Sequence, residues 1–179
     1  MTNHKATLGT LATIFLVLAG GLSRAEETDE QAAAALEKLG GTIIRDEDKP
    51  GKPVKTVYLQ NTKITDPGLA HLKGWKTLKS LYLHGTQVSD AGMVHLKRLK
   101  QLWWLDLSGT QVGDGGLVHL KRMKMLRVLL LRDTKVGDAG LVHLKALKQL
   151  QEVYVSNTKV TDAGVKKLQK ALPEIKIRT

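Results

Sequence analysis

The chain has 179 residues, a length that fits one domain, and its 28 Lys and Arg against 17 Asp and Glu give a formal net charge of +11. It contains no cysteine, which excludes a disulfide framework, a thiolate metal site and a cysteine nucleophile. Aromatic residues make up only 4% of the chain, so the position of each one is informative.

Residues 1–25 have the pattern of a secretory signal peptide. Lys5 supplies the positive start, residues 8–22 are apolar, and Ser23-Arg24-Ala25 places small residues where a cleavage site after Ala25 requires them. The alternative is an uncleaved anchor, but a membrane-spanning helix needs roughly 20 apolar residues, more than this run provides. We therefore expect a secreted or periplasmic protein that touches the membrane only if the signal stays attached.

Residues 26–53 differ in composition from the rest of the chain. Thr28 and Gln31 frame the start of an Ala-rich stretch that ends at Gly40, which predicts a capped helix, and residues 42–45 predict a short strand. The acidic residues 46–48 indicate a solvated loop. Because the open end of stacked repeats needs cover, we interpret this segment as an N-terminal cap.

Residues 54–173 contain five copies of a 24-residue repeat, which begin at Val54, Leu78, Leu102, Leu126 and Leu150. Apolar residues alternate at repeat positions 4 and 6, as in a strand, and recur at positions 16, 19 and 22, as on a helix. One copy is too short to bury its own apolar residues, so the copies must stack into a solenoid. Residues 174–179 predict a C-terminal capping strand with charged residues on its exposed edge.

Three small or polar residues recur in every copy: Thr at position 9, Asp at position 13 and Gly at position 15. We expect the Thr hydroxyl to bond the backbone of the turn, and the Asp carboxylate to cap the helix that begins there. The glycine should allow close packing against the neighbouring repeat. A calcium or catalytic role for the aspartates is a weaker alternative, because each copy offers a single carboxylate.

These motifs are L-x-x-L-x-L-x-x-T, as in residues 78–86, and V-x-D-x-G-L-x-x-L, as in residues 136–144. They resemble the leucine-rich repeat family, and in particular the secreted repeat proteins of planctomycete-type bacteria. F-box substrate receptors have similar repeats, although no ubiquitin-ligase role is expected here, and internalin-like proteins match less well because their period is shorter. The resemblance implies a right-handed α/β solenoid with a parallel sheet on its concave face and short helices on its convex face. It also implies binding, without naming a ligand.

Positions 3, 5 and 7 of each copy should point outward from the concave face. All three tyrosines occupy position 5, and neighbouring strands lie 4.7–4.9 Å apart, so Tyr58 and Tyr82 can stack. The alternative is that aromatic residues simply suit strands and shield a short sheet. We take as the candidate ligand-binding set Tyr58, Tyr82, His84, Trp104, Asp106, Leu130, Arg132, Glu152 and Tyr154.

No catalytic, cofactor or metal site is predicted. His84, Asp106 and Ser108 lie on neighbouring strands, but their spacing encodes no geometry between a base and a nucleophile. Histidines also recur at position 18, where a helix should turn them away from the core, and we attribute them to repeat duplication rather than to a metal ladder: His71, His95, His119 and His143.

Basic residues gather where each helix should end and should form a basic flank: Lys97, Arg98, Lys100, Lys121, Arg122, Lys124, Lys145 and Lys148. Cations are favourable at helix C-termini, which is one explanation. The other is attraction to an acidic polymer: an envelope polysaccharide, anionic lipid or nucleic acid, of which specific nucleic-acid binding is not expected, since no base-reading motif is present.

These observations support two hypotheses. The first is a monomeric, non-catalytic, extracytoplasmic module that binds a protein or an envelope glycan on its concave face. The second is a structural envelope component held by its basic flank.

Overall fold

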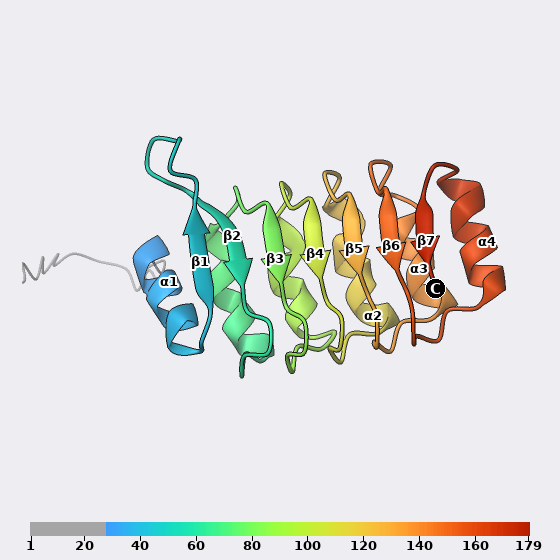
Figure 1. The fold of residues 1–179 in the computed structure, drawn as a ribbon, viewed down its shortest axis with the longest axis horizontal. Coiled ribbons are helices and arrows are strands. Elements are labelled where there is room, and N and C mark those ends of the chain that lie inside the picture. The colour runs from blue at the N-terminus through green and yellow to red at the C-terminus, as the bar shows by residue number, and fades with distance from the viewer. Residues whose placement is uncertain (1–27) are drawn as a thin grey trace, which may run out of the picture.

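The computed structural model describes residues 28–179, which form one sheet backed by a row of helices (Figure 1). Strands and helices alternate along the chain, with these bounds: α1 Asp29–Lys38, β1 Thr42–Arg45, β2 Val54–Tyr58, η1 Asp66–Gly74, β3 Ser80–Tyr82, η2 Gly92–Arg98, β4 Trp104–Asp106, α2 Asp114–Leu117, η3 Val118–Arg122, β5 Val128–Leu130, α3 Asp138–Leu144, β6 Glu152–Tyr154, α4 Asp162–Ala171 and β7 Lys176–Arg178. Elements labelled η are 3₁₀ helices. The predicted signal peptide lies outside the described residues. Within residues 28–179, no helix has the length and apolar character needed to span a bilayer.

The seven strands succeed one another across the sheet in chain order. Strands β2 to β7 are parallel, and each pairs with the next at a shift of one repeat, as in Tyr58 opposite Tyr82. Strand β1 is the exception and runs antiparallel to β2. A loop at residues 46–53 joins β1 to β2 without a crossover helix, and such a direct connection reverses the chain. The prediction of a parallel sheet is therefore confirmed for the repeats, while the strand in the predicted cap runs the other way.

Helix α1 covers the N-terminal end of the core. Thr28 Oγ1 accepts a hydrogen bond from the Gln31 backbone N–H at 3.2 Å, and Gln31 Oε1 accepts one from the Thr28 N–H at 3.0 Å. This reciprocal pair is a capping box and confirms the predicted capped helix. Leu36 is fully buried beneath the helix.

The core is a stack of similar apolar layers. In the third copy seven side chains are completely buried: Leu102, Leu105, Leu107, Val112, Leu117, Leu120 and Met123. They come from the strand, the turn and the helix of one repeat, and each contributes about 1.5–3 kcal/mol of burial free energy. No repeat encloses these residues alone, so the layers stabilise one another.

The recurring threonines act as predicted. Thr86, Thr110 and Thr134 are buried, and each hydroxyl donates a hydrogen bond of 2.6–2.7 Å to the carbonyl three residues earlier. The bond closes the turn at the end of each strand.

A second periodic feature of this turn was not recognised in the sequence. The residue at position 8 has a positive φ, between 55° and 66°, in all five copies: Asn61, Gly85, Gly109, Asp133 and Asn157. Asn, Asp and Gly are the residues that tolerate the left-handed conformation best, which is why only they occur there. This conformation directs the backbone N–H of position 8 toward the next copy, as in Asn61 to the His84 carbonyl at 2.8 Å.

The recurring aspartates of the first four copies do not cap their own helices, and that prediction was wrong. Each of these carboxylates instead accepts hydrogen bonds from the backbone of the next repeat: Asp66 from the Ser89 N–H at 2.7 Å, Asp90 from Gly113 at 2.6 Å, Asp114 from Gly137 and Gly140 at 2.7 and 2.9 Å, and Asp138 from Thr161 at 2.8 Å. The reason is position: in three of these four copies the Asp (Asp66, Asp114, Asp138) is the first helical residue, and the residue before it is the N-cap. We call this row of four carboxylates the aspartate ladder.

The recurring glycines make room for the aspartate ladder. A Cβ added to Gly116 would lie 2.7 Å from Asp90 Oδ1 and 2.9 Å from Val112 Cγ1. A Cβ on Gly140 would lie 2.5 Å from Asp114 Oδ1. The predicted close packing between repeats is thus confirmed, and its partner is the carboxylate of the preceding copy.

We predict that Asp114→Ala lowers the free energy of unfolding by about 2–3 kcal/mol, because it leaves two backbone N–H groups without their charged acceptor. Asp162→Ala is the matched control: Asp162 occupies the same repeat position but is exposed, and only its helix-dipole contribution of about 0.5 kcal/mol should be lost. Urea unfolding monitored by circular dichroism measures both. Equal effects of the two substitutions would contradict a stabilising role for the ladder.

Candidate functional site

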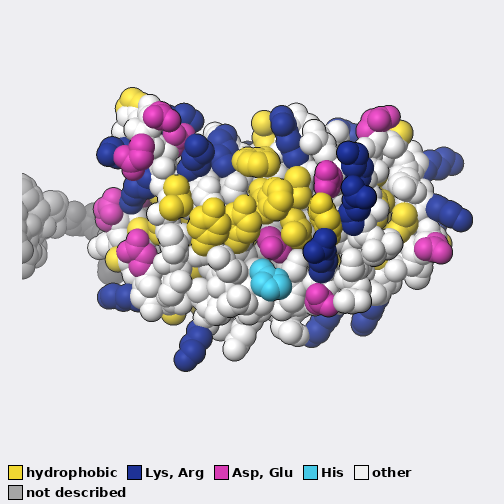
Figure 2. Space-filling model, viewed as in Figure 1, with side chains coloured by type: hydrophobic (Ala, Val, Ile, Leu, Met, Phe, Trp, Pro, Cys, Tyr) yellow, Lys and Arg dark blue, Asp and Glu magenta, His cyan; other side chains and the backbone are white. Residues whose placement is uncertain are grey.

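An aromatic row runs across the concave face from β2 to β4. The Tyr58 and Tyr82 rings are stacked, with centroids 4.8 Å apart and an interplanar angle of 20°, and the Trp104 ring lies 6.0 Å beyond Tyr82. The in-register pairing of β2 with β3 places the tyrosines opposite one another and confirms the predicted stack. Figure 2 shows a continuous band of hydrophobic side chains across this face.

Beyond Trp104 the face becomes more polar. Leu130 lies between Asp106 and Tyr154 in the strand register and is half-buried. The Arg132 guanidinium lies 4.6 Å from the centre of the Tyr154 ring, within cation–π distance. The Tyr154 hydroxyl donates a 2.7 Å hydrogen bond to Glu152 Oε2. The C-terminal half of the face is therefore a cluster of interacting charged and aromatic groups.

Two tyrosine hydroxyls on this face have a raised pKa. For Tyr82 the main cause is burial, and the charges of a Tyr58 phenolate and of Asp106 add to it. For Tyr154 the main cause is the hydrogen bond to Glu152, since an ionised tyrosine would lose the bond and face a carboxylate. Both hydroxyls consequently remain protonated hydrogen-bond donors at neutral pH.

His84, Asp106 and Ser108 are not assembled into a hydrolytic triad. Asp106 accepts a hydrogen bond from the Ser108 backbone N–H at 2.9 Å, while the Ser108 hydroxyl is buried and has no hydrogen-bond partner in the described structure. His84 is exposed at the end of its strand. Within residues 28–179, these three side chains do not form the geometry of a base poised on a nucleophile.

Not every position expected to point outward is accessible. Ser80 and Ser108 are only 6% and 4% exposed, and Trp104 is half-buried with its Nε1 atom enclosed. Small side chains next to large aromatic neighbours lose their solvent contact, and Ser80 lies directly opposite Trp104 in the strand register. The usable surface is therefore formed by the larger side chains of the candidate set.

The histidines at position 18 are not turned fully outward, contrary to prediction. His71, His95, His119 and His143 are all half-buried. In the third and fourth copies the more exposed residue is the preceding one, Val118 or Val142, with 38% and 52% exposure. Burial lowers the pKa of His95 and His143, and neighbouring lysines lower it further. The error lies in the reference direction: measured from the centre of the buried positions 16, 19 and 22, position 17 lies about 160° away and position 18 only about 100°.

The basic flank contains seven exposed residues and one half-buried residue, Lys145. Two of its lysines bond helix ends in the next copy: Lys124 Nζ donates to the Ala146 carbonyl at 2.9 Å and Lys148 Nζ to the Ala171 carbonyl at 3.3 Å. This agrees with the expectation that cations stabilise helix C-termini.

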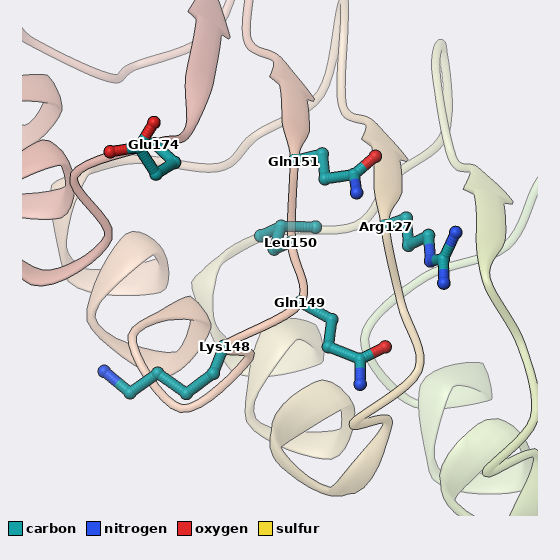
Figure 3. A pocket seen from close by; sticks show the side chains of 6 residues that line it. All are labelled: Arg127, Lys148, Gln149, Leu150, Gln151 and Glu174. Carbon is teal, nitrogen blue, oxygen red and sulfur yellow. The ribbon is translucent and has the colours of Figure 1, made fainter.

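Lys148 also lines an open cavity of about 300 Å³ (Figure 3), together with Arg127, Gln149, Leu150, Gln151 and Glu174. Across residues 28–179, no cluster of three or more His, Asp or Glu side chains is arranged to hold a metal ion.

Two exposed apolar residues beside this flank were missed in the sequence. Trp103 and Met125 are 41% and 42% exposed, and the Trp103 ring meets Trp104 edge-on with centroids 6.0 Å apart. Apart from Pro173, the other copies carry polar residues at the equivalent positions, so the repeat pattern did not single these two out. The aromatic row therefore continues over the edge of the sheet.

Taken together, the parallel sheet, the backing helices and the apolar layers define a leucine-rich-repeat solenoid. Internalin C2 from Listeria monocytogenes is similar, with 18% identity, 82% of this chain and 72% of that chain covered, and a TM-score of 0.52. The leucine-rich-repeat ectodomain of the receptor kinase SOBIR1 from Arabidopsis thaliana is 17% identical, with 86% and 91% covered and a TM-score of 0.56.

A leucine-rich-repeat protein of Leptospira interrogans is 19% identical over 62% of this chain, with a TM-score of 0.49, and the chain spans only 27% of its length. No protein-family model and no curated protein matches the chain. The similarities establish the fold, and the resemblance to planctomycete-type proteins stays a prediction.

We predict that Glu152→Gln lowers the pKa of Tyr154, because the carboxylate that opposes its ionisation is removed. A spectrophotometric titration of tyrosinate absorbance should show one of the three transitions moving to lower pH. Tyr154→Phe is the control and should remove that same transition. A Tyr154 transition that does not move in the Glu152 variant would show that the hydrogen bond does not persist in solution.

Proposed function

We propose that this chain is a protein-binding module whose contact surface is the concave face, centred on Tyr58, Tyr82 and Trp104. The observation that carries the proposal is the stacked aromatic row, which exposes rigid amphipathic side chains in a molecule that is otherwise poor in aromatics. Tyrosine and tryptophan are the residues most enriched at binding hot spots. Solenoids of this kind use such extended surfaces for recognition.

The orientation of the rings favours a protein over a glycan as the partner. Sugars stack on the open face of an aromatic ring, but Tyr82 has the Tyr58 ring at 4.8 Å on one side and the Trp104 ring at 6.0 Å on the other. The row presents ring edges and hydroxyl groups instead, with the Tyr82 hydroxyl held in its donor form. Ring edges and hydroxyl donors can contact a protein surface, which combines apolar side chains with carbonyl acceptors.

The charges on the C-terminal half favour an acidic group in the partner. Arg132 and Arg178 both lie close enough to act electrostatically on Tyr154, and Arg178 is exposed on β7. Glu152 is the main opposing charge and is engaged by the Tyr154 hydroxyl. A partner that places apolar residues on the row and a carboxylate near Arg132 and Arg178 would match both halves of the face.

We place this activity outside the cytoplasm. Support comes from the signal-peptide pattern at residues 1–25 and from the resemblance of the repeats to secreted proteins of planctomycete-type bacteria. The alternative is a structural envelope component held by the basic flank. Salt distinguishes the two, because contacts made by exposed charges weaken as ionic strength rises while the aromatic row does not depend on it.

We predict that the immobilised chain retains a discrete protein from envelope and secreted fractions of the source organism through a high-salt wash. Tyr82→Ala should weaken that complex by about 30-fold or more, the typical effect of a binding hot spot. Surface plasmon resonance with the purified partner measures the change.

Tyr82→Phe and Val118→Ser are the controls for this experiment. The first keeps the ring, and the second alters an exposed apolar residue on the helix side, so both should change the affinity less than threefold, or about 0.6 kcal/mol. Retention only of an acidic polymer at low salt, regardless of the tyrosine, would refute the proposal and favour the structural alternative.

A further inference from the structure

The loops in which helices return to strands form one edge of the solenoid, which lies along the top in Figure 1. We call this edge the strand-entry edge and define it by four segments with equivalent repeat positions: residues 73–79, 97–103, 121–127 and 145–151. These segments contain three, three, four and two Lys or Arg residues respectively, and no Asp or Glu. All of these basic residues are exposed except Lys79 and Lys145, which are half-buried.

Trp103 and Met125 lie in the middle of the strand-entry edge. They occupy the positions that Lys79 and Gln101 hold one repeat earlier, where the two side chains touch at 2.7 Å. Trp103 and Met125 hold the equivalent positions one repeat further along the edge. The Arg127 backbone N–H donates to the Trp103 carbonyl at 2.9 Å, and the Arg127 side chain is exposed. The edge thus carries two exposed apolar residues among exposed basic residues.

We propose that the strand-entry edge docks on an anionic lipid bilayer. Tryptophan is favoured at the boundary between head groups and acyl chains, and Lys or Arg near an anionic surface adds attraction with each residue. An acidic polymer would satisfy the charges but would offer no apolar phase to Trp103 and Met125. The strand-entry edge is a different surface from the proposed protein-binding face, and the two adjoin where Trp103 meets Trp104.

The acidic groups that adjoin this edge lie toward its two ends: Glu152 follows the last segment and accepts a hydrogen bond from the Tyr154 hydroxyl. Glu174 lies at the C-terminal end, where it shares a cavity with Arg127 and Lys148. At the other end, Asp46 pairs with Lys49 at 3.1 Å and Glu47 with Lys52 at 2.6 Å. The central part of the edge, around Lys100 and Arg127, keeps its positive charge. Docking there would leave the concave face perpendicular to the bilayer and open to a partner.

Fluorescence of Trp103 tests the proposal directly. In the full chain carrying Trp104→Phe, Trp103 is the exposed indole, since Trp75 is only 2% exposed. The probes are vesicles of equal parts phosphatidylglycerol and phosphatidylcholine, with acyl chains brominated near the head group, and matching vesicles of phosphatidylcholine alone. We expect a blue shift and strong quenching of Trp103 with the anionic vesicles only. The apolar N-terminal stretch is common to all variants and does not carry the probe.

Matched variants separate the edge from general surface effects. Lys100→Gln with Arg127→Gln should raise the lipid concentration needed for half-maximal quenching by about 30-fold, and Met125→Ser by about tenfold. Lys63→Gln with Lys159→Gln removes two exposed charges from the opposite edge, and Val142→Ser alters an exposed apolar residue on α3. Both controls should stay within about twofold of the parent, because neither touches the edge.

Three results would overturn the proposal: no quenching of Trp103 by anionic vesicles, equal quenching by neutral vesicles, or equal effects of the two charge pairs. An acidic polysaccharide or a single-stranded oligonucleotide that shifts Trp103 emission, where vesicles do not, would assign the edge to a soluble polyanion instead.

Discussion

The hydrogen bond from the backbone of one repeat to an aspartate carboxylate of the repeat before it is the interaction on which the structure depends. Asp114 and Asp138 each span a repeat boundary, and the glycine facing each of them leaves no space for any larger residue. At the same boundaries the strands pair, and Lys124 and Lys148 tie helix ends across the opposite edge. These two boundaries are therefore fixed at both edges and in the middle, which leaves their apolar layers little freedom to slide.

The fixed boundaries between repeats hold the variable side chains of the concave face in one arrangement. Tyr58 and Tyr82 stack because their strands cannot shift relative to each other, and the same register sets Arg132 against Tyr154. Little side-chain entropy remains to be lost when a partner binds such a face. The candidate site is thus pre-organised by contacts made on the other side of the sheet.

The sequence predicted the features that repeat and depend directly on strand geometry. The solenoid, the buried threonines and the Tyr58–Tyr82 stack all required only the 24-residue period and the spacing of strands. The prediction failed where one sequence pattern fits two arrangements. An Asp near a helix start can accept hydrogen bonds from its own helix or from the next repeat, and only the stacking of the copies decides between these two partners.

Other features departed from the period or required the whole apolar face of a helix to be considered. The position 18 histidines were placed by their angle from position 16 alone, whereas the buried face is centred on positions 16, 19 and 22 together. Trp103 was not predicted as an exposed apolar residue because the repeat pattern rests on residues that the copies share, and the neighbouring copies hold Lys79 and Arg127 at this position. The antiparallel direction of β1 depends on a connection that lies outside the repeats.

The left-handed residue at position 8 has a consequence for how such an array can change in length. Asn, Asp or Gly in that conformation supplies its own turn and points its N–H at whichever copy comes next. A gene duplication that inserts one more copy would thus create two boundaries that are already compatible, with no new turn to evolve. Mutations at position 8, in contrast, are confined to Asn, Asp and Gly by the conformation of the backbone, so drift at this position should be slow whether or not a ligand contacts it.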